Sequence, residues 1–536
     1  MTVPPPDPAG SVRGTGTPTA TDPRSATDPR SAASAPTSAA GPPPSGRAEP
    51  APPPGCPAHA YGPGGLIRLY GPEAETDPMG LYERLRAQHG AVAPVLLHGD
   101  LPAWLVLGYR ENLDVARTPS RFSRDSRHWR LAREGRVAPD HPLAPVVAWQ
   151  PMCTQVDGRE HERLRGAVTD SIDRFDRRGI RRTVTRSAHL LIDRFCVDGR
   201  ADLVRQFSDH LPMLVMTRLL GMPESYGPKL VDAARDLLKG TETAVASNDY
   251  VLRALRRLVA RKHASPGQDF ASWLIEHPAG LTDDEVEQHL RLVLIAAYET
   301  TANLIINMLR MVLTDRRFRA DLAGGHMTLP DAMEQVLWDE PPMMTAVGRW
   351  ATGDTELAGQ SIRAGDLLIL GLAAGNLDPA IRPDPSVPVH GNRSHLAFSG
   401  GPHECPGQDI GRAIADTGVE ALLARLPDLR LAVEETELSW VSALMTRHLT
   451  ALPVEFTPHR PAPEETSPAA AGPAPSRRAE LPGEAAGRAG AAVPAAPPRT
   501  EAAVAGVPDP LAAGSGRPPL PAAPWWRRAV RWFTGG

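Results

Sequence analysis

The chain has 536 residues, with 58 Lys and Arg against 62 Asp and Glu, and a formal net charge of −4. This balance gives no reason to expect nucleic acid or another polyanion as a partner. The four cysteines show no C-x-x-C spacing, which argues against a disulfide framework or a zinc ribbon. The N-terminus lacks the apolar core of a signal peptide, so we expect a cytoplasmic protein.

Proline divides the chain into a body and two tails. Of the 58 prolines, 16 lie in residues 1–60 and 15 lie after residue 458. Residues 1–60 and 459–524 are rich in Pro and Ala and have too little apolar surface to offset the entropy of ordering, so we predict that both are disordered. Residues 61–458 are long enough to form a large globular domain.

The last twelve residues, 525–536, differ from the tail before them. Trp and Phe recur there at helical spacing, with Arg on the other face. This pattern predicts a short basic-aromatic amphipathic helix over 525–533. Such a helix would make a weak contact with an anionic membrane surface or with a protein groove.

The apolar periodicity of the body predicts a mainly α fold with a smaller β region. The segments with a period near 3.6 residues are predicted helices: 159–175, 184–197, 201–221, 249–263, 284–314, 329–338 and 408–425. The segments predicted as strands lie near the start and the end of the body: 91–97, 103–107, 346–351, 360–362, 367–371 and 449–456.

A cysteine-containing loop over residues 395–412 reads HLAFSGGPHECPGQDIGR. Cys405 follows Gly-Gly-Pro and precedes Pro-Gly, directly before a predicted helix. Backbone N–H groups of such a loop and the helix N-terminus favour an anion at the sulfur. A lone thiolate held in this way is a good axial ligand for haem iron. For a single Cys the commoner alternative is a small buried apolar side chain.

The spacing around this cysteine resembles the haem-ligand signature of the cytochrome P450 family, the haem-thiolate monooxygenases. The resemblance implies a cytochrome P450 fold over 61–458, haem b as cofactor and Cys405 as the proximal iron ligand. The matching positions, which the resemblance places at the haem, are Phe398, Gly401, His403, Cys405 and Gly407.

Two positions within the signature depart from the family, since Ser399 stands where Gly is usual and Pro406 where Leu is common. The front of the body, DPMGLYERLRAQHGAV over 77–92, also resembles the first helix of the family.

A second segment, LRLVLIAAYETTAN over 290–303, lies in a long apolar helix. By resemblance, Glu299 and Thr300 relay protons on the distal side of the haem, because splitting dioxygen consumes two protons. The alternative is a charge and a hydroxyl on an exposed helix turn. Ala297 replaces a Gly that is usual in the family, and Tyr298 is the side chain that we expect to contact the substrate.

Four further residues match the family's contacts to the haem propionates. His161 and Arg165 are i, i+4 neighbours in DGREHERLR, so they share one helix face. Arg349 lies in a predicted strand, and His395 opens the cysteine loop. For an isolated His-x-x-x-Arg a solvated charged face is the alternative interpretation.

The family's Glu-x-x-Arg motif is missing from the helix DAMEQVLWDEPPM. In register, Gln335 and Trp338 occupy the Glu and Arg positions, and His390 stands at the usual third partner. Glu334 has no Arg at i+3 or i+4, so we predict that a buried ionic triad is replaced by neutral groups as a set. In this the chain resembles a subgroup of soluble bacterial members with Glu-Gln-x-x-Trp.

The resemblance implies a monooxygenase that activates dioxygen to oxidise a small organic substrate. No G-x-G-x-x-G opens a helix after a strand, so electrons are expected from a separate ferredoxin and ferredoxin reductase-type partner. The rival hypothesis is a haem-binding sensing or assembly protein with little turnover, given the missing motif, Ala297 and the tails. A peroxide-driven oxygenase fits less well, because an acid-hydroxyl pair is present.

Overall fold

The computed structural model describes residues 65–461, except 138–146, 224–225, 227–228, 231, 234–243 and 390. Nearly all of both predicted tails and the whole of the predicted helix 525–533 lie outside the described residues. His390 lies outside them as well.

Helices form the larger part of the described chain, as the periodicity predicts. They are α1 (Pro72–Thr76), α2 (Pro78–His89), α3 (Tyr109–Arg117), α4 (Arg130–Arg133), α6 (Gly158–Asp173), α7 (Arg177–Ile192), α8 (Leu211–Leu219), α10 (Ala244–Ala264), α11 (Phe270–Ile275), α12 (Asp283–Thr314), α13 (Arg316–Ala323), α14 (Leu329–Asp339), α15 (Leu372–Asn376) and α16 (Gln408–Arg425).

The strands gather near the two ends of the body, which confirms the predicted mainly α fold with a smaller β region. They are β1 (Ile67–Arg68), β2 (Val92–Leu97), β3 (Leu101–Val106), β4 (Phe122–Ser123), β5 (Arg200–Asp202), β6 (Ala346–Ala351), β7 (Thr355–Leu357), β8 (Gln360–Ile362), β9 (Leu367–Leu370), β10 (Arg430–Leu431), β11 (Trp440–Ser442), β12 (Arg447–Leu449) and β13 (Pro453–Glu455).

The largest sheet has six strands in the order β1-β2-β3-β9-β6-β4, and the three smaller sheets are β10-β13-β5, β11-β12 and β7-β8. Strand β6 carries a bulge, because Val347 pairs with Ile369 and Arg349 pairs with Leu368, which leaves Gly348 between them. Gly348 has φ 101°, a conformation that glycine adopts without strain. A bulge redirects the side chains that follow it, and here the next residue is Arg349.

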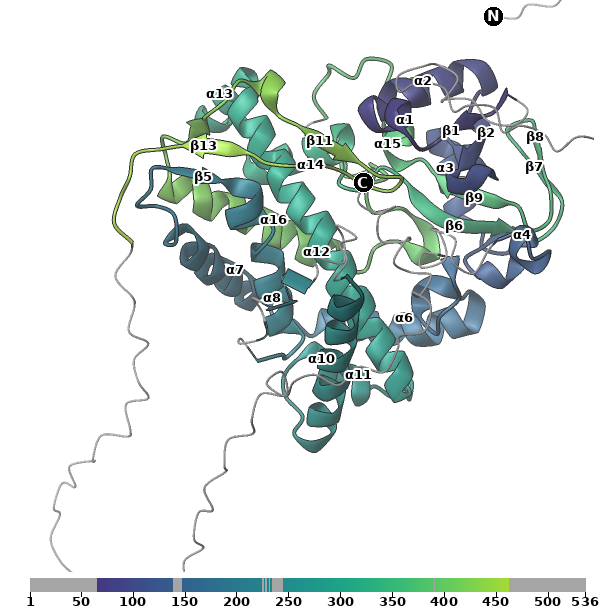
Figure 1. Ribbon diagram of the computed structural model, residues 1–536, viewed down its shortest axis with the longest axis horizontal. Helices are drawn as coiled ribbons and strands as arrows, with labels where there is room; N and C mark the ends of the chain where they lie inside the picture. The colour runs from purple at the N-terminus through teal and green to yellow at the C-terminus, as the bar shows by residue number, and fades with distance from the viewer. Residues whose placement is uncertain are drawn as a thin grey trace, which may run out of the picture. The chain divides into compact units, whose positions relative to one another are not determined.

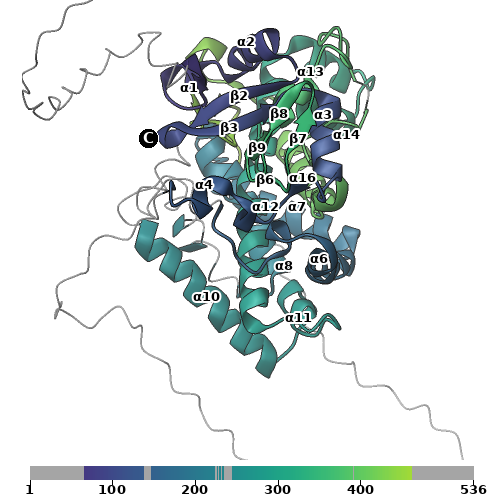
Figure 2. The same ribbon diagram turned by 90° about the vertical axis from the view of Figure 1, so that its right-hand side faces the viewer.

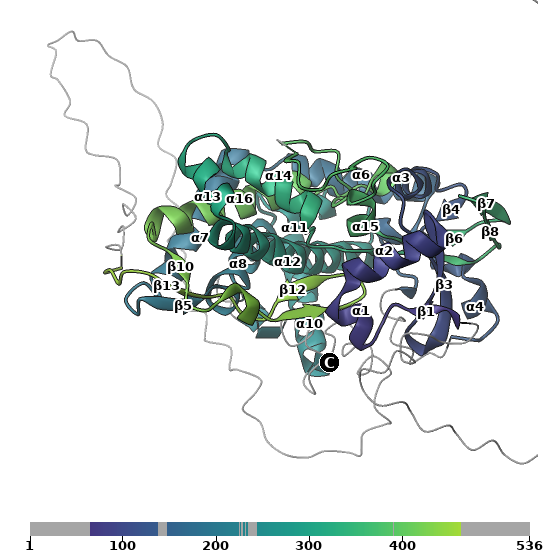
Figure 3. The same ribbon diagram turned by 90° about the horizontal axis from the view of Figure 1, so that it is seen from above.

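Helix α12 is the central helix of the largest core, and α16, α8, α10 and α14 pack against it. A capping box between Thr282 and Glu285 fixes its start. By length and composition α12 could cross a membrane, but most of its apolar stretch is buried inside the protein. Figures 1 and 3 show it running between α14, α16 and α8, with α7 beyond α16. In Figure 2 the strands of the six-stranded sheet lie above α12, and α10 and α11 lie below it.

Three predicted segments differ most from the structure. The predicted helix 201–221 is strand β5, a short π-helical turn and α8, because Pro212 fits the first turn of a helix but not its interior. The predicted helix 184–197 lies within and just beyond α7, which starts earlier at a cap formed by Asp176. The predicted strand 449–456 is divided between the end of β12 and β13.

Candidate functional site

Cys405 lies between a 3₁₀ turn, Gly401–His403, and the start of α16. Its backbone N–H donates to the carbonyl of Phe398 at 3.0 Å, and its side chain is partly buried. Burial raises the pKa of the thiol, while a backbone hydrogen bond from Gly407 and the charge of Arg165 act in the opposite direction. One backbone donor and one nearby cation therefore oppose the effect of burial, and both would stabilise the negative charge of a ligating sulfur.

The described residues contain no group of three or more His, Cys, Asp or Glu side chains placed to hold a metal ion.

Two residues of the cysteine loop have positive φ angles. Gly401 has φ 70°, and a Cβ atom there would lie 2.5 Å from the carbonyl oxygen of Ala116, so the position requires glycine. Ser399 has φ 60° and does carry a side chain. A left-handed conformation costs an ordinary residue about 1–2 kcal/mol, so the loop contains one strained position.

We expect Ser399→Gly to raise the free energy of unfolding by up to about 1 kcal/mol, because glycine removes the strain but adds entropy to the unfolded chain. Thermal or denaturant unfolding of the variant measures this. The control is Ser394→Gly, five residues earlier, where φ is not positive and only the entropic loss applies. Equal destabilisation by both substitutions would contradict the strain at Ser399.

His161 on α6 and Arg349 on β6 are buried donors without partners. Their side chains expose 6% and 2% of their surface, and His161 Nε2 and Arg349 Nε and Nη1 find no hydrogen-bond partner among the described residues. Burial lowers the pKa of both groups, that of Arg349 strongly, and the neighbouring Arg124 adds repulsion on Arg349. Burying a cation without a counter-charge costs several kcal/mol. The pair therefore fits an anionic group that the polypeptide does not itself supply, such as a carboxylate.

His403 links this pair to the cysteine loop. Its ring lies 4.1 Å from the ring of His161, and its Nε2 lies 2.9 Å from Asp157 Oδ1. Burial lowers the pKa of His403 to about 3, more than the hydrogen bond to Asp157 raises it. Burial would raise the pKa of Asp157, but hydrogen bonds from His403, Ser123 Oγ and the Arg124 backbone N–H outweigh it and lower that pKa to about 2.

Sequence reasoning missed Asp157 and Arg124. Asp157 occupies the N-cap position of α6, four residues before His161, without a capping hydrogen bond from its side chain, so its place just ahead of the predicted helix was the available signal. Arg124 donates to the carbonyls of Val347 and Gly348 at 2.8 and 2.7 Å, and nothing in its own segment indicates this contact.

Arg165, the second member of the predicted His161–Arg165 pair, contacts the cysteine loop. Its guanidinium donates to the backbone carbonyl of Glu404 and to Thr169 Oγ1. Arg165 is thus partly engaged by protein atoms next to Cys405, whereas His161 keeps an unpaired nitrogen.

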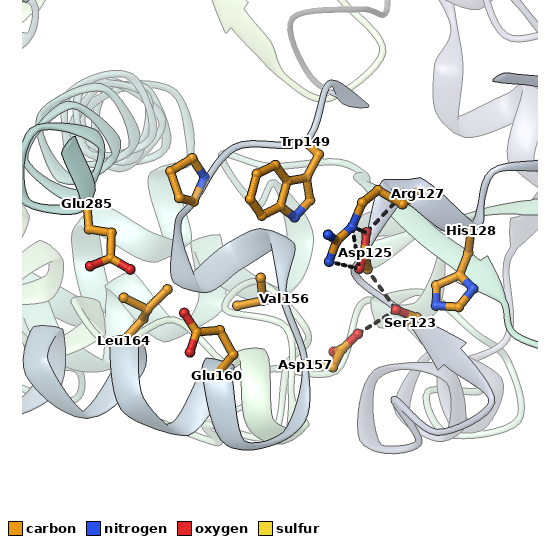
Figure 4. A pocket seen from close by; sticks show the side chains of 11 residues that line it. Ser123, Asp125, Arg127, His128, Trp149, Val156, Asp157, Glu160, Leu164 and Glu285 are labelled. Carbon is orange, nitrogen blue, oxygen red and sulfur yellow. Dashed lines mark hydrogen bonds and ion pairs between the residues drawn. The ribbon is translucent and has the colours of Figure 1, made fainter. Parts of the chain in front are cut away.

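Asp157 also lines a pocket of about 370 Å³ (Figure 4). Its ionic groups already pair with each other or with neighbours. Arg127 holds Asp125 and lies over the ring of Trp149, and Arg163 holds both Glu160 and Glu285. The pocket therefore borders the cluster of donors but offers no free charge of its own.

His395, predicted as a propionate donor, is engaged elsewhere. It is buried, its Nε2 lies 2.9 Å from Glu334 Oε2, and its Nδ1 accepts the backbone N–H of Ala397 at 3.2 Å. With both nitrogens used, the structure does not place His395 with His161 and Arg349. Its role as a propionate donor stays a prediction.

The prediction that neutral groups replace the buried ionic triad is wrong, because the structure has a buried ion pair next to these positions. Glu334 is 1% exposed and forms a bidentate ion pair with Arg412, with Nε–Oε1 2.8 Å and Nη2–Oε2 3.2 Å. The hydrogen bonds from His395 and Arg412 lower the pKa of this carboxyl, although burial opposes them. The partner of Glu334 is not one helical turn away on α14: Arg412 comes from α16, 78 residues along the chain.

Trp338 is buried, as predicted for an apolar side chain at this position. Its Nε1 donates to the carbonyl of Asn392 at 2.7 Å, and its ring stacks on Tyr109 with centroids 6.4 Å apart. The guanidinium of Arg382 lies 5.9 Å from the Trp338 ring and pairs with Asp339 at 2.6 Å. An ion pair therefore flanks the indole.

Gln335, at the Glu position of the missing motif, links α14 to the segment before the cysteine loop through hydrogen bonds. Its side chain donates to Asp339 and accepts the backbone N–H of Val389.

The middle of α12 is its least buried part. Ile295 is 38% exposed, and Ala296, Glu299 and Thr300 lie on the same side of the helix. Thr446 Oγ1 donates to Glu299 Oε1 at 3.0 Å. Burial raises the pKa of Glu299, so this carboxyl keeps its proton to a higher pH than an ordinary glutamate.

Next to Glu299, the Thr300 hydroxyl donates to the Ala296 carbonyl at 2.7 Å. Tyr298, expected to contact the substrate, is 3% exposed and packs in the core, so it does not lie on the open side of α12.

Comparison with known proteins gives a consistent set of relatives, although no protein-family model matches the chain. The chain is 30% identical over 393 residues to 2-hydroxy-5-methyl-1-naphthoate 7-hydroxylase of Streptomyces carzinostaticus, covering 71% of this chain and 95% of the relative. It is 32% identical over 413 residues to the cytochrome P450 monooxygenase PikC of Streptomyces venezuelae, with 74% and 95% covered.

Solved structures agree with these relatives. CYP154C4 from Streptomyces sp. W2061 matches with a TM-score of 0.66 at 26% identity, covering 73% of this chain and 97% of that one. The myxobacterial cytochrome P450 CYP267B1, solved with myristic acid, matches with a TM-score of 0.65 at 27% identity, covering 73% and 99%.

Proposed function

This chain belongs to the cytochrome P450 family and is an oxidoreductase of the monooxygenase type, and from that premise we propose that it activates dioxygen to hydroxylate a small organic substrate. The observation that carries the proposal is the combination of one backbone-held thiol, Cys405, with two buried unpaired donors, His161 and Arg349.

Haem b fits these residues. A haem needs one axial protein ligand and brings two propionates, and the structure offers the thiol of the cysteine loop together with buried donors whose nitrogens have no hydrogen-bond partner. We propose that Cys405 ligates the iron and that His161, Arg349 and His403 bind a propionate. When bound, haem supplies the electron transfer and the oxygen chemistry of the reaction.

Proton delivery is the task that we assign to Glu299 and Thr300. Burial raises the pKa of Glu299, so its carboxyl holds a proton to a higher pH than an ordinary glutamate and can donate it. The Thr300 hydroxyl, one residue further along the open side of α12, can pass a proton on when it rotates away from the Ala296 carbonyl. Thr446 orients the acid through its hydrogen bond to Glu299.

The substrate and the electron donor follow from chemistry and from the relatives. Ile295 and Ala296 give the open side of α12 an apolar surface, which suits a small, largely apolar molecule. One relative is named as a naphthoate hydroxylase, and one structure contains myristic acid. We propose electron supply by a ferredoxin and ferredoxin reductase pair, and a cytoplasmic location.

Reduced carbon monoxide spectroscopy of the full chain tests this function. The expected result is an absorption band at the long-wavelength position typical of thiolate-ligated haem. Substrate-dependent NADPH consumption and hydroxylated product, with surrogate ferredoxin partners, then separate a monooxygenase from a haem-binding sensor or assembly protein. A thiolate band without product from a broad set of apolar compounds would favour the sensor.

We expect Thr300→Ala to keep haem binding but to divert reducing equivalents from product to hydrogen peroxide or water, typically by 10²–10⁴-fold in coupled rate for a lost proton-transfer group. The ratio of product formed to NADPH consumed measures this. Thr300→Ser retains the hydroxyl and should keep the coupling. Thr301→Ala removes a buried hydroxyl beside the relay and serves as the stability control. Unchanged coupling in Thr300→Ala would remove Thr300 from the mechanism.

A further inference from the structure

One buried carboxylate joins both ends of the cysteine loop. Glu334 on α14 contacts His395, which opens the loop, and Arg412, which lies one turn into α16 after it. These two residues are 17 positions apart, with Cys405 between them, and Arg412 Nη2 also lies 3.4 Å from His395 Nε2. The more exposed Arg393 adds a second cation 3.4 Å from Glu334.

The contacts continue from this carboxylate toward the sulfur. The guanidinium of Arg412 lies 4.5 Å from the centre of the Phe398 ring. The ring of His395 lies 5.7 Å from the same phenyl ring. The Phe398 carbonyl in turn accepts the backbone N–H of Cys405 at 3.0 Å. Glu334 therefore reaches the cysteine through Arg412 and Phe398.

An ion pair that only stabilised the fold would not need to contact residues on both sides of the cysteine loop. Buried ion pairs are weak sources of stability, because desolvation of the charges offsets their attraction, and apolar replacements are often as stable. Glu334 instead fixes the spacing between the residue that enters the loop and the residue that leaves it. The rigid elements α14 and α16 carry the two charged groups, so the loop between them has little freedom to shift.

We propose that Glu334 is a positioning residue for Cys405, holding the base of the loop at the spacing that presents the sulfur as a ligand. Glu334 directly precedes Gln335, which occupies the Glu position of the missing Glu-x-x-Arg motif. Its ion-pair partner, Arg412, comes from another helix. The proposal rests on the proposed function only in taking Cys405 as the iron ligand.

The test compares Glu334→Gln with Glu340→Gln in the full chain loaded with haem. Glu340 caps the same helix and pairs with Arg310 at 2.5 Å. Its contacts run to Arg310 on α12, not to the loop. Loss of a residue that orients a metal ligand typically weakens metal binding by about 10–100-fold, so Glu334→Gln should release haem to apomyoglobin at least about tenfold faster. Its carbon monoxide band should move partly away from the thiolate position, while Glu340→Gln keeps the parent's band and release rate.

A double variant separates positioning from stability. Glu334→Gln alone strands the buried guanidinium of Arg412, so Glu334→Gln/Arg412→Met should recover the thermal midpoint of the haem-free protein. It should not recover the band or the release rate. If Glu334→Gln does not fold, the carbon monoxide band and the haem release rate of the double variant alone test the proposal.

Three results would overturn the proposal: a parent-like band and release rate in Glu334→Gln, an equal change in Glu340→Gln, or full recovery of the band in the double variant. A parent protein without a thiolate-type band would refute the proposed function instead.

Discussion

Cys405→Ser should abolish the thiolate-type carbon monoxide band completely. A serine hydroxyl is a poor ligand for haem iron and does not ionise near neutral pH, so the substitution removes the ligand with little change in side-chain volume. The sulfur accepts a backbone hydrogen bond and is partly buried, so we expect the loop to keep its shape in the variant. The measurement is the reduced carbon monoxide difference spectrum, with bound haem quantified in parallel.

The other described cysteines supply the controls. Cys153 and Cys196 are both buried free thiols. Burial raises the pKa of Cys153 to about 11 and also raises that of Cys196, as it does for Cys405, so the position in the cysteine loop is what separates Cys405 from the other two. Their Ser variants should keep the band. Loss of the band in either one, together with its survival in Cys405→Ser, would move the ligand assignment away from Cys405.

Trp338→Ala should lower the free energy of unfolding by about 3–5 kcal/mol, the usual result of truncating a buried tryptophan. The indole is 4% exposed, stacks on Tyr109 and donates to the Asn392 carbonyl. Its loss opens a cavity between α14 and the segment that leads to the cysteine loop, so bound haem should be retained less well. Denaturant unfolding and haem content of the purified protein measure the two effects.

Two further variants serve as controls for this prediction. Trp149→Ala removes a tryptophan that is 40% exposed and should cost much less. Trp338→Arg places a second guanidinium next to Arg382, which already pairs with Asp339, so it should also destabilise. A parent-like stability of Trp338→Arg would show that the indole does not fill a closed site.

Prediction of the fold from sequence succeeded where apolar periodicity ran over three or more helical turns, as in α12 and α16. It failed at 201–221, where the period of the apolar residues continues across a strand and a turn and only Pro212 marks the break. Helix α7 was placed too late because its first turn, from Arg177 to Ile180, carries little apolar signal before its first buried residue.

The candidate site was predictable where one segment carries the chemistry. The spacing around Cys405 and the Glu299-Thr300 pair could be found in this way. Contacts between distant segments could not, because nothing in a local pattern pairs Glu334 with Arg412 or Asp157 with His403.

The position of Tyr298 could have been predicted from helix geometry. Its neighbour Glu299 lies on the open side of α12, but one step along a helix turns a side chain by about 100°, which carries Tyr298 into the core.

The unpaired donors His161 and Arg349 bear on the fate of a newly made chain. Without a bound anion, the protein must fold with nitrogens of these groups buried and lacking hydrogen-bond partners, which lowers its stability. A ligand that binds only the folded state adds about 2.7 kcal/mol when its free concentration is a hundred times its dissociation constant. Chains that find haem are thus kept, while those that do not unfold more often and are open to proteases. The cellular amount of this protein should therefore follow the supply of haem, because His161 and Arg349 make the haem-free chain less stable.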